Sequence, residues 1–144
     1  MAVDGGLRGL FQTHLKPAGF HCQAIETGST GRGIPDMEYC SGGVSGWVEF
    51  KKCSANSVQI SPEQVAWILQ RKRAGGNVYI GVRKKCSAGL RRKAADELWL
   101  IEGSSAADLK ENGLSSPGLW VLGKWSGGPK KWDWEQVRKI LLGA

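Results

Sequence analysis

The sequence lacks long hydrophobic runs and clustered metal-binding residues. Its apolar runs are only a few residues long, too short to span a bilayer. The N-terminus has neither the basic start nor the apolar centre of a signal peptide. The four cysteines are widely spaced, form no C-x-x-C pair, and have only two histidines as possible partners in a zinc site. We therefore expect a cytoplasmic protein with reduced structural thiols and no membrane partner.

The motifs of several enzyme classes are also absent. The sequence contains no P-loop, no H-E-x-x-H and no G-x-S-x-G nucleophile elbow. The glycine-rich loop from Thr27 to Gly33 differs in glycine spacing from a dinucleotide fingerprint. It also precedes an expected strand, whereas that fingerprint must open a helix. These absences leave little support for nucleotide-dependent, zinc-protease or serine-hydrolase chemistry.

Composition and length indicate one globular domain with a polyanionic partner. The 144 residues are 41% hydrophobic and 23% charged, which is ordinary for a folded domain. The predicted domain spans residues 1–144, with a core at about 20–83 and a C-terminal extension at about 97–144. A net charge of +7 favours nucleic acid as partner, because basic side chains release the counterions condensed on phosphates.

Hydrophobic periodicity predicts alternating helices and strands. A capping box at Ser61 and Gln64, with Pro62 in the first turn, starts the clearest helix, and Gly75 ends it. The other expected helices are 7–15, 104–111 and 133–142. The expected strands are 20–26, 36–40, 46–52, 77–83, 97–101 and 119–123. The strand, helix and strand over 46–83 imply a parallel crossover, so we expect an α/β fold with a mixed central sheet flanked by helices.

Two carboxylates and a lysine form the candidate catalytic group. The two-residue period of a strand places Glu49 and Lys51 on one face. Asp36 opens the neighbouring strand, so the three side chains can converge at the sheet edge. Asp36, Glu49 and the carbonyl of Phe50 offer the oxygen ligands that Mg²⁺ prefers, and Mn²⁺ is expected to substitute. Lys51 would orient or deprotonate a water, or stabilise transition-state charge; the sequence leaves these roles open.

The motifs that carry a family resemblance are Gly33-Ile34-Pro35-Asp36, Val48-Glu49-Phe50-Lys51 and Ser61-Pro62-Glu63-Gln64-Val65-Ala66-Trp67. This pattern, over about residues 26–83, resembles the VRR-NUC branch of the PD-(D/E)xK nuclease superfamily. The resemblance implies a restriction-endonuclease-like core and magnesium-dependent hydrolysis of DNA phosphodiester bonds at Asp36, Glu49 and Lys51.

The resemblance also implies two further site residues. An upstream acid, as a catalytic and metal-binding residue, would map to Glu26, and a helix glutamine beside the active site would map to Gln64. Each has a competing interpretation: Glu26 as an ordinary charge at a strand end, and Gln64 as the capping-box residue. In some relatives the acid lies on the first helix, but the segment from Leu7 to Leu15 contains no carboxylate.

Basic side chains outside this group are candidate DNA contacts, although solvated surface charges explain them equally well. They are Arg32, Lys52, Lys84, Lys85, Arg91 and Arg92. We interpret the segment that carries the last four as a flexible loop. Four tryptophans crowd the C-terminal part, and we expect core packing or a subunit interface in preference to base stacking.

Small chains that resemble this family occur in phage and bacteria, and some resemble Holliday junction resolvases. The resemblance therefore implies a homodimer that cuts branched DNA in recombination or repair, in bacterial or phage-infected cytoplasm. One alternative is a sequence-selective or nicking nuclease of the restriction or homing type. Another is a non-catalytic DNA-binding factor that keeps the fold.

Overall fold

The computed structural model describes residues 4–26 and 32–143. Within these ranges the strands are β1 (His21–Ala24), β2 (Met37–Ser41), β3 (Val44–Cys53), β4 (Val78–Cys86), β5 (Ala95–Glu102) and β6 (Val121–Trp125). The α-helices are α1 (Leu7–Leu15), α2 (Pro62–Arg73), α3 (Ala106–Asn112) and α4 (Trp134–Leu141). Short 3-10 turns are η1 (Lys16–Ala18), η2 (Gly103–Ser105) and η3 (Gly113–Ser115).

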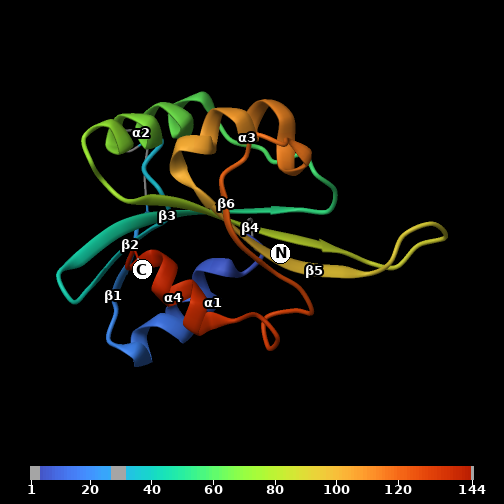
Figure 1. Cartoon of the computed structure of the whole chain (residues 1–144), viewed down its shortest axis with the longest axis horizontal. Coiled ribbons are helices and arrows are strands. Elements are labelled where there is room, and N and C mark those ends of the chain that lie inside the picture. The colour runs from blue at the N-terminus through green and yellow to red at the C-terminus, as the bar shows by residue number, and fades with distance from the viewer. Residues whose placement is uncertain (1–3, 27–31, 144) are drawn as a thin grey trace.

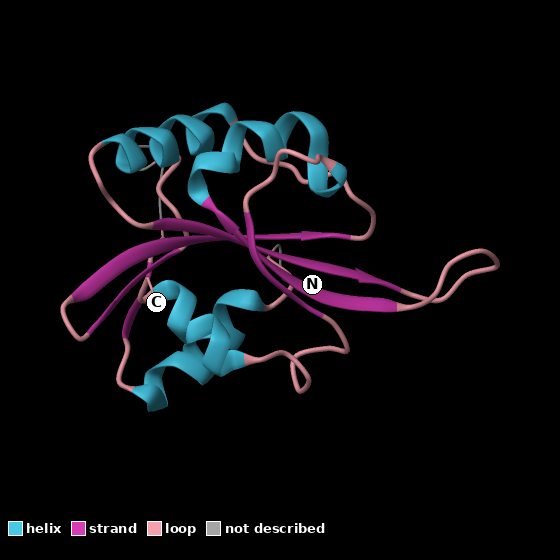
Figure 2. Ribbon diagram, viewed as in Figure 1, coloured by secondary structure: helices cyan, strands magenta, loops and turns pink. Residues whose placement is uncertain are grey.

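All six strands form one sheet in the order in which they occur along the chain. The central pair, β3 and β4, is parallel, and every other neighbouring pair is antiparallel. Helix α2 connects the parallel pair, as the sequence predicts. Helices α2 and α3 cover one face of the sheet, and α1 and α4 cover the other (Figures 1 and 2). The predicted mixed sheet flanked by helices is confirmed.

Each face of the sheet has its own hydrophobic core. Val48 and Phe50 join the cluster formed with α1 and α4, whereas Trp47 packs against the cluster under α2 and α3. The predicted alternation along β3 is therefore confirmed. The C-terminal tryptophans Trp125, Trp132 and Trp134 are buried in the first cluster, while Trp120 remains 58% exposed. Packing explains most of the tryptophans near the C-terminus.

The prediction of a flexible loop over the basic segment is wrong for Lys84 and Lys85. Both residues lie in β4, which pairs with β5 as far as the register Cys86 with Ala95. Hydrogen bonding to β5 extends β4 past the hydrophobic residues from which the strand was predicted. Strand β6 likewise begins later than predicted, at Val121. All four cysteines are free, and none of the described helices is long and apolar enough to cross a membrane.

Candidate active site

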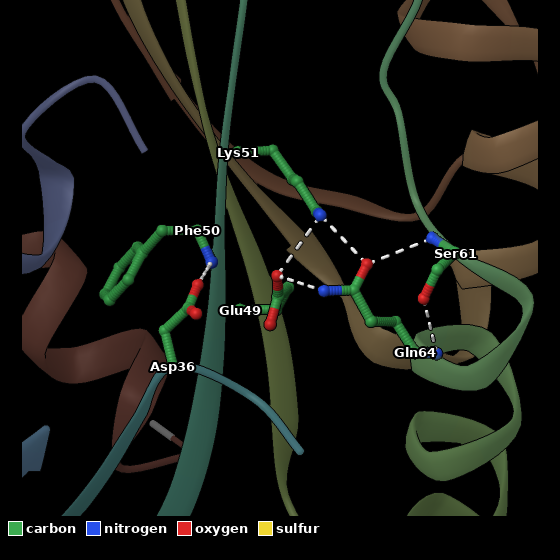
Figure 3. Close-up of polar contacts among 6 residues, drawn as sticks. All are labelled: Asp36, Glu49, Phe50, Lys51, Ser61 and Gln64. Atoms are coloured by element: carbon green, nitrogen blue, oxygen red, sulfur yellow. Dashed lines mark hydrogen bonds and ion pairs between the residues drawn. The ribbon is translucent and has the colours of Figure 1, made fainter. Parts of the chain in front are cut away.

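The candidate site lies where β3 continues past the start of β2. Met37, the first residue of β2, pairs with Val48, so β2 does not accompany β3 from Glu49 onward. Asp36 directly precedes β2, and its Oδ2 accepts a 2.9 Å hydrogen bond from the backbone N–H of Phe50 (Figure 3). The Asp36 carboxylate thus continues the hydrogen bonding along the edge of β3 that faces β2. The sheet itself places Asp36 beside Glu49.

Three side chains form a closed polar cluster on the α2 side of β3 (Figure 3). Gln64 Nε2 donates to Glu49 Oε2 over 3.0 Å, and Lys51 Nζ donates to Gln64 Oε1 over 2.9 Å. Lys51 Nζ also lies 3.3 Å from Glu49 Oε2. Each member is therefore held by the other two, and the lysine ammonium has a defined position next to the carboxylate.

Gln64 belongs to the cluster and to the capping box at the same time. Its Oε1 also accepts a 3.0 Å hydrogen bond from the backbone N–H of Ser61, and Ser61 Oγ accepts one from the N–H of Gln64. The two interpretations of Gln64 are thus compatible. The start of α2 and the polar cluster share one amide side chain.

The end of the glycine-rich loop packs against α2. Gly33 has a φ of 85°, and a Cβ there would lie 2.3 Å from the backbone oxygen of Glu63. Only glycine permits this approach. From this contact the chain continues through Ile34 into Pro35 and Asp36. Residues 27–31 of the glycine-rich loop lie outside the described residues.

Burial disfavours the charged forms of the two carboxyl groups, and at Glu49 the nearby charge of Asp36 adds to this effect. Glu49 is only 2% exposed, and burial, then the nearby charge of Asp36, raise its pKa to about 8. Burial also raises the pKa of Asp36, although the Phe50 N–H and Lys51 partly offset this. Among the described residues, Glu49 Oε1 is buried without a hydrogen-bond partner. A cation bound here would compensate the charge of both carboxylates and give Glu49 Oε1 a partner.

The donor set fits an oxygen-coordinated cation that keeps several waters. The part of the chain that the structure describes has no group of three or more His, Cys, Asp or Glu side chains able to hold a metal. A cation would therefore have only Asp36 and Glu49 as acidic ligands. The carbonyl of Phe50, on the same strand edge, is a further oxygen donor. Such a sparse set is typical of Mg²⁺ sites.

Asp4 and Arg8, which the sequence interpretation missed, line the same cavity. It measures about 360 Å³, and its other lining residues are Asp36, Glu49, Phe50, Lys51 and Gln64. Asp4 caps α1 by accepting hydrogen bonds from the N–H groups of Gly6 and Arg8, at 2.9 and 3.0 Å. The charge of Asp4 raises the pKa of Asp36, and Arg8 lowers it. An Asp ahead of the first helix predicts these local hydrogen bonds but does not predict the approach of Asp4 to Asp36.

Glu26 is not brought to the site. It is exposed in the segment after β1 and does not line the cavity that contains Asp36 and Glu49. The upstream acid nearest to the candidate centre is instead Asp4. The position of Asp4 is set by Gly5 and Gly6, both with positive φ, and by a 2.8 Å hydrogen bond from Arg83 to the Gly5 carbonyl.

The candidate DNA contacts are spread over two regions. Arg32 is exposed in the turn before Asp36, and Lys52 is exposed on β3. Lys84 donates to Asn56 over 2.8 Å. Lys85 is exposed near the end of β4, and Arg91 and Arg92 lie in the turn between β4 and β5. Four of these basic residues therefore belong to a single hairpin.

Comparison with known proteins supports the architecture. No family model matches the chain, and neither does any curated protein. Among solved structures, Hjc from Archaeoglobus fulgidus, a Holliday junction resolvase from an archaeal hyperthermophile, superposes with a TM-score of 0.53. The alignment covers 94% of this chain and 96% of that protein, at 14% sequence identity.

This chain has the fold of that resolvase. The match extends over nearly all of both chains, so the strands and helices outside the motif region belong to the shared architecture. The predicted α/β fold with a restriction-endonuclease-like core is confirmed. At this identity the match concerns the fold, and the VRR-NUC branch stays a prediction.

Proposed function

We propose that this chain is a magnesium-dependent endonuclease that hydrolyses phosphodiester bonds in branched DNA. The observation that carries the proposal is the buried carboxylate of Glu49, which has an unpartnered oxygen beside Asp36. Burying two acidic groups together destabilises a fold unless a proton or a cation compensates them. A divalent cation is the compensating group that also performs chemistry on phosphate.

Asp36, Glu49 and the Phe50 carbonyl would hold the ion, and Mn²⁺ would substitute for Mg²⁺ because both accept oxygen ligands. When bound, the ion supplies Lewis-acid polarisation of a phosphate oxygen and lowers the pKa of a coordinated water. Asp36 would be oriented by its hydrogen bond from Phe50, and Glu49 by its bond from Gln64. The ligands would thus be preorganised.

Lys51 would supply positive charge to the reacting phosphate. Its ammonium is held between Glu49 and Gln64, so little reorganisation is needed when negative charge develops in the transition state. Gln64 acts as the positioning residue for both Lys51 and Glu49. Asp4 and Arg8 would adjust the charge of the cavity from the other side of Asp36.

Three features support DNA, and branched DNA in particular, as the substrate. The chain carries a net charge of +7, which suits a polyanion. The candidate carboxylates line a cavity of about 360 Å³ together with Lys51 and Arg8. The fold is that of a protein described as a Holliday junction resolvase. A homodimer would present two such centres to two strands of a junction.

The test is cleavage of a labelled four-way junction beside a matched linear duplex and a matched single strand, each in Mg²⁺ and in EDTA. Symmetric cutting of the junction, in Mg²⁺ alone and in preference to the linear DNA, supports the proposal. Cutting of linear or single-stranded DNA without junction preference would retain the nuclease and contradict branched selectivity. DNA binding without cutting in Mg²⁺ or Mn²⁺ would favour a non-catalytic factor.

A further inference from the structure

The hairpin between β4 and β5 extends beyond the rest of the molecule (Figure 1). Residues 83–93 contain Arg and Lys but no Asp or Glu. The cations are Arg83, Lys84, Lys85, Arg91, Arg92 and Lys93. A projecting element with charge of one sign is suited to a partner of the opposite sign. The hairpin is much longer than is needed for packing against the hydrophobic core.

Leu90 stands at the tip of this hairpin and is fully exposed, with a relative exposure of 107%. Among the described residues, only Trp120 is another exposed large hydrophobic side chain. The hairpin closes around Leu90 through an isolated bridge between Gly89 and Arg92. The Gly89 N–H donates to the Arg92 carbonyl over 3.0 Å. The apolar side chain is therefore presented outward, with Arg91 directly following it.

Polar contacts along the hairpin hold its shape. Arg92 Nε donates to the Ser87 carbonyl over 3.1 Å. At the base, Arg83 makes a bidentate pair with Asp96, with both distances 2.8 Å, and such forks are rigid. A preorganised element loses less conformational entropy on binding than a disordered one. The hairpin is thus built to hold its tip away from the sheet.

A basic hollow lies at the base of the hairpin, next to the segment that carries Asp4. Its lining includes Lys52, Arg83, Lys85 and Arg92, together with Gly5 and Gly6. These two glycines directly follow Asp4, which lines the cavity with the carboxylates. A polyanionic strand that runs from the reacting phosphate toward the hairpin would therefore meet the cations of this hollow.

The length of the hairpin sets how far its tip can reach from the candidate active site. Val82 pairs with Lys51, and Leu90 follows eight residues later. At roughly 3.3 Å per residue, the tip lies roughly 25 Å beyond the catalytic lysine. For a duplex lying along the hairpin, with a rise of about 3.4 Å per base pair, this reach corresponds to roughly seven base pairs.

From these observations we infer that the hairpin is a DNA wedge, in which Leu90 inserts between stacked base pairs while Arg91 and Lys93 contact the flanking phosphates. The inference rests on the proposed nuclease function. It adds a contact that makes binding depend on how easily the duplex deforms beside the cut. Apolar side chains flanked by basic residues act in this way in proteins that kink DNA. Flexible steps, or the unpaired centre of a junction, would accept the wedge most easily.

The test uses the full chain and junction DNA carrying 2-aminopurine at successive positions along one arm, in EDTA so that the DNA stays intact. Binding of the wild type should raise the fluorescence at about seven base pairs from the cut, because unstacking relieves its quenching. Leu90→Ala should lose this rise and bind roughly tenfold more weakly, since one buried leucine is removed. Leu90→Met, which keeps a large apolar side chain, should retain the rise.

Trp120→Ala is the matched control, because it removes the other exposed apolar side chain at the far end of β5. It should leave both affinity and fluorescence unchanged. Replacing Arg91 and Lys93 with Gln should make binding less dependent on salt. The slope of the logarithm of the binding constant against the logarithm of the salt concentration should fall by the equivalent of roughly two phosphate contacts. Because Leu90, Arg91 and Lys93 are exposed, the variants at these three positions should unfold at the wild-type temperature.

Two outcomes would overturn the wedge alone. One is a Leu90→Ala protein that binds and perturbs DNA as the wild type does while cutting continues. The other is a change in oligomeric state on the same substitution with the DNA response intact, which would make the tip an interface between copies of the chain. If the wild type neither binds nor cuts any DNA, the wedge and the proposed nuclease function fail together.

Discussion

Gln64 donates a hydrogen bond to Glu49 across 3.0 Å, joining the first turn of α2 to the strand that carries the candidate catalytic residues. The same side chain accepts from Lys51 and closes the capping box with Ser61. Secondary structure and chemistry are therefore connected at one residue. Substitutions on α2 can separate the two roles.

Replacing Ser61 and Gln64 one at a time should distinguish capping from positioning. Ser61→Ala and Gln64→Ala should each lower the free energy of unfolding by about 1 kcal/mol, because each removes part of the cap. Only Gln64→Ala should also slow cleavage, by roughly tenfold or more, since it removes the amide that positions both Lys51 and Glu49. Urea unfolding and single-turnover cleavage measure the two effects. Equal slowing by Ser61→Ala would mean that Gln64 acts only through the helix.

The stability of the metal-free protein should fall as pH rises. The pKa of Glu49 is raised to about 8 in the folded state, from 4.5 in the unfolded chain. Its favourable contribution is therefore fully present below pH 4.5 and is lost as pH rises through about 8. The loss should be on the order of a few kcal/mol, and Glu49→Gln should reduce it.

Urea unfolding in EDTA across this pH range measures the effect. Mg²⁺ should stabilise the wild type more at the alkaline end, because metal and proton compete for the same carboxylates. Glu135→Gln is a suitable control, since Glu135 is exposed on α4. A wild-type stability that rises steadily with pH in EDTA would contradict a protonated Glu49.

Asp4 and Glu26 offer a direct comparison of two upstream acids. Asp4→Asn keeps one of the two side-chain oxygens that accept from the Gly6 and Arg8 N–H groups, and it removes the charge that acts on Asp36. We expect weaker attraction of the divalent ion and a several-fold higher Mg²⁺ concentration for half-maximal cleavage. Glu26→Gln, outside the cavity, should leave that concentration unchanged. A reversed pattern would restore Glu26 as the upstream acid.

Local patterns predicted the parts of the site that depend on local geometry. The two-residue period of β3 and the Ser61 cap follow from steric and hydrogen-bonding preferences within a few residues. Those parts agree with the structure. The α/β architecture followed from the order of these elements.

Contacts between distant segments were beyond such patterns. The approach of Asp4 to Asp36 depends on Arg83 anchoring Gly5 from β4, and no short-range signal encodes it. The extension of β4 to Cys86 depends on pairing with β5. Glu26 was placed by its position in a motif, whereas the fold leaves it exposed. Tertiary packing decided each of these cases.

The most direct test of the metal-dependent nuclease is cleavage of labelled four-way junction DNA in Mg²⁺ by wild type, Glu49→Gln and the control Glu135→Gln. Glutamine is close in size to glutamate but lacks the charge that would hold the ion. The account predicts normal cutting by wild type and control and a loss of roughly a hundredfold or more in Glu49→Gln. Unchanged cutting by Glu49→Gln would contradict it.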